Sequence, residues 1–424
     1  MTPITVPLTQ PLALSRCTLT SREGVLLTLT LSRAGDSSSS GGSASGADGR
    51  SGGGSSGGGG SGGGGSGGGG SSGGGGVGSG GTYRGVSEVT PLPGFHKETL
   101  QQGQEQLQTL ARALAGRQVP PLATALDGSI GRWLAAALGT GAAAALLPSV
   151  RCGVEMALLH ALAAAADVPM AALIAAAALP ARRCCGAVRM NSLLTRSPAQ
   201  PVTTSRPLQH WSHVVKVKVG GACGPRADAD RVNAIAARGD TRLRLDANQA
   251  WTLHEALAFT RELSPRARNA VEYIEEPLRD PRQLPRFSDA TDGFPFALDE
   301  SVTDGVGSVA DLTDLRPTAL VLKPTVMGGV EETVSWAQAA AHCGAAVVIT
   351  SAFETGVCLS HLAILASALS SEGTCHGLST FDRLSKEGEG RVWLPDFSEA
   401  VYDGDMIDVA VCQRLLDTCA SRLV

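Results

Sequence analysis

The sequence lacks the patterns that identify several common protein classes. Its ten cysteines include no CxxC pair and no Cys/His spacing typical of a zinc site, so we expect reduced core thiols. Its 35 basic residues are scattered and the net charge is −4, which excludes a basic nucleic-acid footprint or a polybasic membrane patch. The most apolar window, 156–181, is mostly alanine and is interrupted by Asp167 and Pro169, so no membrane span is expected. The expected partner is a small molecule.

One long segment lacks the residues that build a core. Residues 34–81 are almost entirely Gly, Ser and Ala and hold 27 of the 54 glycines. Such a segment cannot bury enough apolar surface to offset its chain entropy, so we expect a disordered insertion within a domain. The rest of the chain is long enough for one large domain or two medium ones.

The flanks of the insertion predict a small α+β domain. Residues 9–32 alternate like two strands, which we place around a turn at Arg22-Glu23-Gly24. Glu88 and the Pro-containing turn at 91–94 are expected to belong to loops that close over a site. Helical patterns follow at 97–116, 120–138 and 149–176.

From Ala187 onward, β-rich runs alternate with helix-length segments. Repeated βα units of this length predict a parallel TIM-type barrel, because each parallel pairing needs a crossover helix. Seven units are clear and the eighth is weak, so the fold class is α/β, a (β/α)7–8 barrel with the α+β domain as a cap. An open doubly wound sheet is the alternative, but no Gly-rich phosphate turn follows the first strand. The expected strands are 187–194, 213–219, 241–247, 270–276, 295–300, 318–323, 345–351 and, weakly, 376–380.

Charged residues recur at the carboxyl ends of these strands. In order they are Lys218, Asp246, Glu275, Asp299 and Lys323. Alternation along the strands directs them into the mouth of the barrel, where unpaired charges are too costly to keep, so they must compensate one another or a ligand. The neighbouring acids Glu276 and Glu300 are expected to face the helices instead, and an ion-pair network that only rigidifies the barrel is the structural alternative.

Three carboxylates on adjacent strands, with no His or Cys nearby, suit a hard cation. Asp246, Glu275 and Asp299 therefore predict a site for Mg²⁺ or Mn²⁺ rather than zinc. A divalent cation that binds a substrate carboxylate favours loss of the neighbouring C–H proton. Lys218 and Lys323 could act on opposite faces of the substrate, as in racemisation. Alternatively, one lysine moves the proton while the other stays cationic.

The segments KVKVG, RLRLDANQAW, VEYIEEP, ALDES and VLKPTVMGG, in this order, resemble the enolase superfamily. The segments VTPLPGFHKETL, PSVRCGVEMALL and VRMNSLL are similar to the o-succinylbenzoate synthase family within it. This resemblance implies a magnesium-dependent lyase of menaquinone or phylloquinone biosynthesis. Lys218 would be the acid/base, Lys323 the opposite cationic lysine, and Asp246, Glu275 and Asp299 the metal ligands.

The resemblance also suggests contacts to the substrate, a small carboxylate. Arg244 and Asn248 flank Asp246 and resemble positions near the substrate, although they could serve only hydrogen bonding at the barrel mouth. Thr350 and Ser351 end the seventh strand, where they could hold the succinyl carboxylate. The sequence there reads ITSAFETG rather than a serine run, which leaves their side-chain roles open.

The resulting organisation has five segments. Residues 1–33 and 82–186 would form the cap, 34–81 the insertion, 187–385 the barrel, and 386–424 a segment that returns to the cap. The chain could be one module of a larger fused biosynthetic protein. We expect a soluble intracellular protein, in the plastid of a plant or alga and otherwise in the cytoplasm, with no nucleic-acid or membrane partner.

Two other functions stay open at this point. An N-succinylamino acid racemase or dipeptide epimerase would share the two lysines and three acids, so only cap residues would distinguish it. A non-catalytic barrel serving as a scaffold module belongs to a different class, and it would bind Mg²⁺ without turnover.

Overall fold

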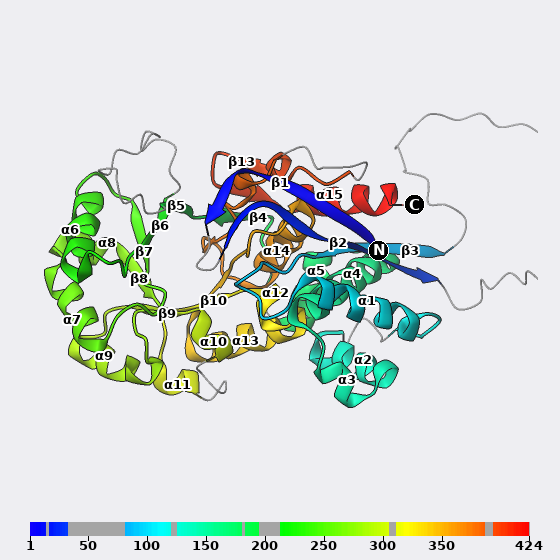
Figure 1. Ribbon diagram of the computed structural model, residues 1–424, viewed down its shortest axis with the longest axis horizontal. Helices are drawn as coiled ribbons and strands as arrows, with labels where there is room; N and C mark the ends of the chain where they lie inside the picture. Colours follow the sequence, from blue (N-terminus) through cyan, green and yellow to red (C-terminus); the bar gives the residue numbers. More distant parts are fainter. Residues whose placement is uncertain are drawn as a thin grey trace, which may run out of the picture.

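The computed structural model describes residues 1–13, 17–32, 81–119, 125–179, 183–194, 213–304, 311–385 and 393–423. Apart from Gly81, the predicted insertion at 34–81 lies outside these residues. The molecule has a capping sheet with helices and, beside it, a parallel (β/α) barrel (Figure 1). The predicted fold class is confirmed.

The cap is built on a three-stranded antiparallel sheet with the order β1-β2-β3. Its strands are β1 Thr2–Ala13, β2 Thr18–Ser32 and β3 Thr82–Val89. The predicted turn at 22–24 is wrong, because these residues lie within β2 and pair with β1. Gly24 is needed for close packing instead, since a Cβ there would lie 2.1 Å from Cγ2 of Thr90.

Helices of the cap follow β3 along the chain. The predicted helix at 149–176 is in fact two helices, because Asp167 adopts a left-handed conformation (φ 55°) and Pro169 follows it. A capping box between Thr99 and Gln102 begins the first helix. The bounds are α1 Leu100–Leu114, η2 Ala125–Ser129, α2 Ile130–Leu138, α3 Thr140–Ala144, α4 Pro148–Ala166 and α5 Met170–Ala178.

The apolar helix α4 packs against β3 of the capping sheet. By length and composition it is the one helix among the described residues that could cross a membrane, but 78% of its most apolar window is buried inside the fold. Gly85 of β3 permits this packing, since a Cβ there would lie 1.9 Å from the carbonyl oxygen of Ala157 in α4. Burial of this kind is typical of a core helix.

The barrel strands form a seven-stranded parallel sheet with the order β11-β10-β9-β8-β7-β6-β5. The register aligns Lys218 with Asp246 and Asp246 with Glu275. The strands are β5 Ser192–Leu194, β6 Val214–Lys218, β7 Arg242–Asp246, β8 Val271–Glu275, β9 Phe296–Leu298, β10 Ala319–Leu322 and β11 Ala346–Ile349.

Hydrogen bonds continue around the ring beyond β11. Gly377 N donates to Ile349 O at 3.0 Å, next to β12 Cys375–His376, and β12 pairs in parallel with β4 Ala187–Met190. The expected first strand, 187–194, is divided at Asn191 into β4 and β5. The weak eighth strand is therefore present, but it is shorter than the predicted 376–380.

The outer layer consists of helices between the strands (Figure 1). The amphipathic segments 227–238, 253–263 and 330–343 form, within a few residues, α6, α7 and α13. The bounds are α6 Gly224–Ala236, α7 Leu253–Glu262, α8 Pro265–Ala270, η4 Pro281–Gln283, α9 Leu284–Ala290, α10 Glu300–Asp304, α11 Asp311–Leu315, α12 Pro324–Met327, α13 Val330–Cys343 and α14 Gly356–Leu369.

The last part of the chain contacts both halves of the molecule. β14 pairs with β4, and α15 packs against α14 and against β3 of the capping sheet. The assignment of 386–424 to the cap stays a prediction. The elements are η5 Phe381–Arg383, η6 Phe397–Ala400, β13 Val401–Tyr402, β14 Met406–Asp408 and α15 Val409–Arg422.

A small apolar cluster fills the barrel below its charged mouth. Its members alternate along the strands with residues that face the helices, and they form a cluster separate from the main core: Tyr273, Ala297, Ala319, Val321 and Val348. Val321 of this cluster also lines the pocket together with Asp299 and Lys323, so the apolar cluster adjoins the charged strand ends.

Candidate active site

The two lysines of β6 point into the barrel mouth, as alternation predicts. Lys218 Nζ lies 2.5 Å from Oδ2 of Asp246 and 2.7 Å from Oδ1 of Asn248. Lys216 Nζ lies 2.8 Å from the same Asp246 oxygen and 2.6 Å from Oε1 of Glu275. Lys216 therefore links two of the three expected metal ligands.

Lys323 completes the group from the opposite side. It follows β10 at the start of α12, and its ammonium contacts both carboxylate oxygens of Asp299. The same ammonium lies 5.1 Å from the ring centroid of Phe95 in the cap. The five strand-end residues named from the sequence are thus brought together. Lys216 joins them, and its position could have been inferred because it shares a face with Lys218.

The three acids are deeply buried, with exposed fractions of 1% for Asp246, 1% for Glu275 and 6% for Asp299. Burial and the charge of Asp246 raise the pKa of Glu275 to about 8. Burial also raises the pKa of Asp299. At Asp246 burial acts in the same direction, but Lys216 and Lys218 outweigh it and lower the pKa below its usual range. Burying these acids close together therefore costs electrostatic free energy, which the positive charges of the lysines offset.

The chemistry of these acids fits a hard divalent cation. All their donor atoms are oxygens, and nearby positive charge opposes the burial and the repulsion from Asp246 that raise the pKa of Glu275. Within the described part of the chain, no three acidic, His or Cys side chains are already grouped as a metal site. Instead, the ammonium of Lys216 lies between Asp246 and Glu275. Asp246, Glu275 and Asp299 are the residues that would hold Mg²⁺.

The neighbouring acids behave differently from each other. Glu276 accepts hydrogen bonds from the backbone N–H groups of Asp299 (2.7 Å) and Ser301 (2.8 Å), so it supports the loop rather than the mouth. Glu300 was expected to face the helices, and this is wrong. It lines the pocket and accepts from Nδ2 of Asn248 at 3.2 Å. The reason is that β9 ends at Leu298 and α10 begins at Glu300, so strand alternation no longer applies.

Two expected substrate contacts lie at different depths. Asn248 is at the mouth, between Lys218 and Glu300. Arg244 is 5% exposed, and its Nη1 donates to the carbonyl oxygen of Cys375 at 2.7 Å, across the barrel. Its Nε donates to Glu272 at 2.8 Å. The substrate-binding role of Arg244 stays a prediction that these contacts do not support.

Thr350 and Ser351 join two strands of the barrel. Their hydroxyls donate to the carbonyl oxygen of Gly377 at 3.1 and 3.2 Å, and Ser351 Oγ also lies 2.7 Å from the Thr380 hydroxyl. These contacts hold β11 beside the eighth strand. Binding of the succinyl carboxylate at these residues also stays a prediction.

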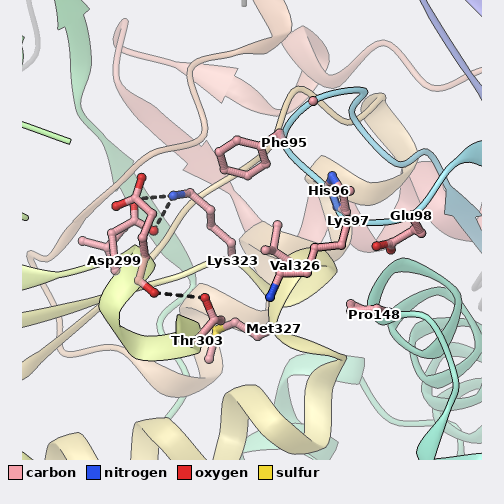
Figure 2. A pocket seen from close by; sticks show the side chains of 13 residues that line it. Phe95, His96, Lys97, Glu98, Pro148, Asp299, Thr303, Lys323, Val326 and Met327 are labelled. Atoms are coloured by element: carbon pink, nitrogen blue, oxygen red, sulfur yellow. Dashed lines mark hydrogen bonds and ion pairs between the residues drawn. The ribbon is translucent and has the colours of Figure 1, made fainter. Parts of the chain in front are cut away.

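A pocket of about 260 Å³ lies between the barrel mouth and the cap (Figure 2). The loop after β3 covers it, which confirms that the turn at 91–94 reaches the site through Gly94. Glu88 does not belong to a loop. It lies in β3 and accepts from Thr355 N at 2.8 Å. The pocket is lined from the cap by Gly94, Phe95, His96, Lys97, Glu98 and Pro148.

Comparison with known proteins agrees with this geometry. Residues 205–396 match the family model described as enolase C-terminal domain-like. The o-succinylbenzoate synthase of Aliivibrio fischeri (strain ATCC 700601 / ES114) is 38% identical over 170 residues, 40% of this chain and 51% of the relative. That of Pectobacterium atrosepticum is 34% identical over 197 residues, 46% of this chain and 59% of the relative. The chain thus spans only half or somewhat more of the length of these curated relatives.

Solved structures share the fold over nearly the whole chain. A mandelate racemase/muconate lactonizing protein from Herpetosiphon aurantiacus has a TM-score of 0.65 at 19% identity, covering 96% of this chain and 93% of that one. The L-Ala-D/L-Glu epimerase of Bacillus subtilis has a TM-score of 0.64 at 20% identity, covering 96% and 94%. Residues 205–396 thus match the enolase C-terminal domain-like family, and the solved structures share the cap-and-barrel fold of the chain.

Proposed function

We propose that this chain is an o-succinylbenzoate synthase. It would dehydrate 2-succinyl-6-hydroxy-2,4-cyclohexadiene-1-carboxylate to 2-succinylbenzoate in menaquinone or phylloquinone biosynthesis. The observation that carries the proposal is the group of Lys218, Asp246, Glu275, Asp299 and Lys323 in one buried mouth. The names of the partial relatives, from Aliivibrio fischeri and Pectobacterium atrosepticum, support this choice among the activities of the superfamily.

The chain's own residues account for the proton transfers. Lys218, as a neutral amine, takes the proton from the ring carbon that bears the carboxylate. The resulting ammonium then gives this proton to the departing hydroxyl on the same face, so that water leaves and the ring becomes aromatic. Mg²⁺ held by Asp246, Glu275 and Asp299 would stabilise the negative charge that develops on the carboxylate. Lys323 stays cationic because burial, which lowers its pKa, is outweighed by Asp299 and Glu300, which raise it.

One assay tests the proposal directly. Purified full-length chain is mixed with the cyclohexadiene substrate and Mg²⁺, and loss of the diene absorbance is followed. We expect turnover that EDTA abolishes and excess Mg²⁺ restores. Asp246→Asn should lose both Mg²⁺ binding and turnover. The matched control is Asp240→Asn, because this aspartate is fully exposed and lies outside the site.

A second activity on the same scaffold has one observation in its favour. Lys218 and Lys323 approach the acids from opposite sides, as removal and return of a proton on opposite faces would require. An N-succinylamino acid racemase or dipeptide epimerase would therefore racemise its amino-acid substrate while leaving the cyclohexadiene unchanged. A non-catalytic module would bind Mg²⁺ and turn over neither substrate.

A further inference from the structure

The amine of Lys218 lies at the end of a flexible side chain, so its neighbours must set its direction. The side chain is 33% exposed, and Nζ lies 2.5 Å from Oδ2 of Asp246 and 2.7 Å from Oδ1 of Asn248. The Asp246 oxygen is shared, because Nζ of Lys216 lies 2.8 Å from it, and Asp246 is one of the residues that would hold Mg²⁺. Asn248 is therefore the neighbour that can stay with Lys218 when Asp246 holds the cation.

The backbone of Asn248 is fixed, but its amide is not. Asn248 has a φ of 45°, in the left-handed region that asparagine tolerates better than most residues. Its N–H donates to Oδ1 of Asp246 at 3.1 Å, and the N–H of Gln249 donates to the carbonyl oxygen of Glu276 at 2.7 Å. The side chain of Asn248 is exposed, so packing does not determine which end of the amide faces Lys218. A half-turn would replace the carbonyl oxygen with the NH2 group, which cannot accept a hydrogen bond.

Glu300 selects one orientation of this amide. Its Oε1 accepts from Nδ2 of Asn248 at 3.2 Å, and an ionised carboxylate has no hydrogen to donate to the carbonyl end. The other oxygen, Oε2, is buried and has no hydrogen-bond partner among the described residues, which makes this carboxylate costly to keep. Glu300 begins α10, whereas Asn248 follows β7, so the contact joins two separate segments of the mouth.

We propose that Glu300 is a positioning residue, which acts through Asn248 to hold the amine of Lys218 in the direction that proton transfer requires. The inference rests on the proposed function, in which Lys218 moves the proton. When the neutral amine donates an N–H to the carbonyl oxygen of Asn248, its lone pair points away from that oxygen. Without Glu300 the amide can turn, and the amine loses this fixed acceptor. A displacement of about 1 Å in a reacting group can cost about 100-fold in rate.

The test uses the full chain with Mg²⁺ and the variants Glu300→Met, Glu300→Gln and Asn248→Gly. Glu300→Met removes the acceptor, so kcat for the cyclohexadiene substrate should fall about 10- to 100-fold while KM changes little. Glu300→Gln keeps an oxygen that can accept from Asn248, so it should recover most of the activity. Asn248→Gly suits the left-handed backbone and removes the amide, so it should lower kcat as much as Glu300→Met does. The double variant should fall no further, because both changes break the same chain of contacts.

Binding measurements separate this role from direct contact with a ligand. By calorimetry, the Kd of Mg²⁺ and the Kd of 2-succinylbenzoate should change little in all three variants. Glu262→Met is a control, because this exposed glutamate ends α7 in the outer layer of helices, and it should match wild type. Melting temperatures report whether each variant folds. Asn248→Gly and Glu300→Gln test the same contact if Glu300→Met does not fold.

Other results would overturn the inference. If Glu300→Gln loses as much activity as Glu300→Met, or if both markedly weaken Mg²⁺ binding, the charge of Glu300 matters rather than its contact with Asn248. Unchanged kcat in Glu300→Met or Asn248→Gly, or losses that multiply in the double variant, would also contradict it. In all these cases the wild-type chain would still convert the cyclohexadiene, so the proposed function would stand. A wild-type chain without this turnover would refute the proposed function and this inference together.

Discussion

Buried carboxylates occur in two regions of the molecule, and their partners differ. At the barrel mouth, Asp246, Glu275 and Asp299 contact lysine side chains. Where the cap meets the barrel, Glu155 and Glu331 pair with the permanently charged Arg151 and also accept from backbone N–H groups at helix starts. Backbone amides are fixed dipoles, whereas lysines move and exchange protons. Carboxylates of similar burial thus have a proposed catalytic role in one region and a structural role in the other.

The second region, which we call the cap–barrel joint, consists of Glu88, Glu155, Glu331 and the helix starts they contact. Glu155 of α4 accepts from Val330 N at 2.6 Å, where α13 of the barrel begins. Glu331 of α13 accepts from Ile130 N (3.0 Å) and Gly131 N (2.8 Å), where α2 of the cap begins. Glu88 of β3 accepts from Thr355 N, before α14. Some of these hydrogen bonds have their donor in the barrel and their acceptor in the cap, and others the reverse. Together they fix the cap above the mouth.

The largest expected effect comes from the mouth. Lys218→Ala should lower kcat about 10³-fold or more, because the amine that moves the proton is lost, while the melting temperature changes little. Steady-state kinetics and circular dichroism measure the two quantities. Arg282→Ala is a matched control, because this side chain is 87% exposed and pairs with the neighbouring Asp280, away from the mouth. Normal dehydration by Lys218→Ala would contradict the mechanism.

An intermediate effect is expected at the joint. Burial raises the pKa of Glu155 to about 7 from an ordinary value near 4.5. The folded protein therefore holds a proton that the unfolded chain releases, so this residue makes the free energy of unfolding fall as pH rises from about 4.5 to 7. The change is on the order of 3 kcal/mol. Urea unfolding at pH 5 and pH 7 should show a smaller pH dependence for Glu155→Gln than for wild type. If the free energy of unfolding changed by the same amount between pH 5 and pH 7 in Glu155→Gln and in wild type, the pKa of Glu155 would not be raised by folding.

The smallest expected effect is also at the joint. Thr355→Ala removes the side chain that caps α14 and donates to Glu88, so the free energy of unfolding should fall by about 1 kcal/mol. Thr355→Ser, which keeps the hydroxyl, should be close to wild type. Turnover per folded molecule should stay unchanged in both. If Thr355→Ala instead lowered kcat without lowering stability, the separation between joint and mouth would be wrong.

Periodicity explains which parts of the site could be predicted. The alternation of side chains along β6 and β7 predicted that Lys218 and Asp246 point into the barrel, because each residue of a five-residue strand can point only to one of two faces. The same rule failed at Glu300, where the strand had already ended. It also could not assign the depth of Arg244, because direction along a strand does not say which partner lies across the barrel.

Contacts between distant segments were beyond the reach of sequence patterns. Gly24 resembles a turn residue but lies in a strand, where the close approach of Thr90 leaves no room for a Cβ. Local sequence patterns do not reveal this contact, because Thr90 is far away in the chain. Glu88, Glu155 and Glu331 have no periodic signature, since their partners lie in helices of the other half of the molecule. The role of the loop above the pocket likewise depends on how the cap is seated.

The sequence by itself determined the barrel, its order of strands and the five charged residues at its mouth, because strand geometry repeats every two residues and each βα unit is local. Only the tertiary structure decided that Lys216 lies between Asp246 and Glu275, that Lys97 and Phe95 cover the pocket, and that three buried glutamates join cap to barrel. These features depend on distances between residues far apart in the chain, which become fixed only when the two halves pack together.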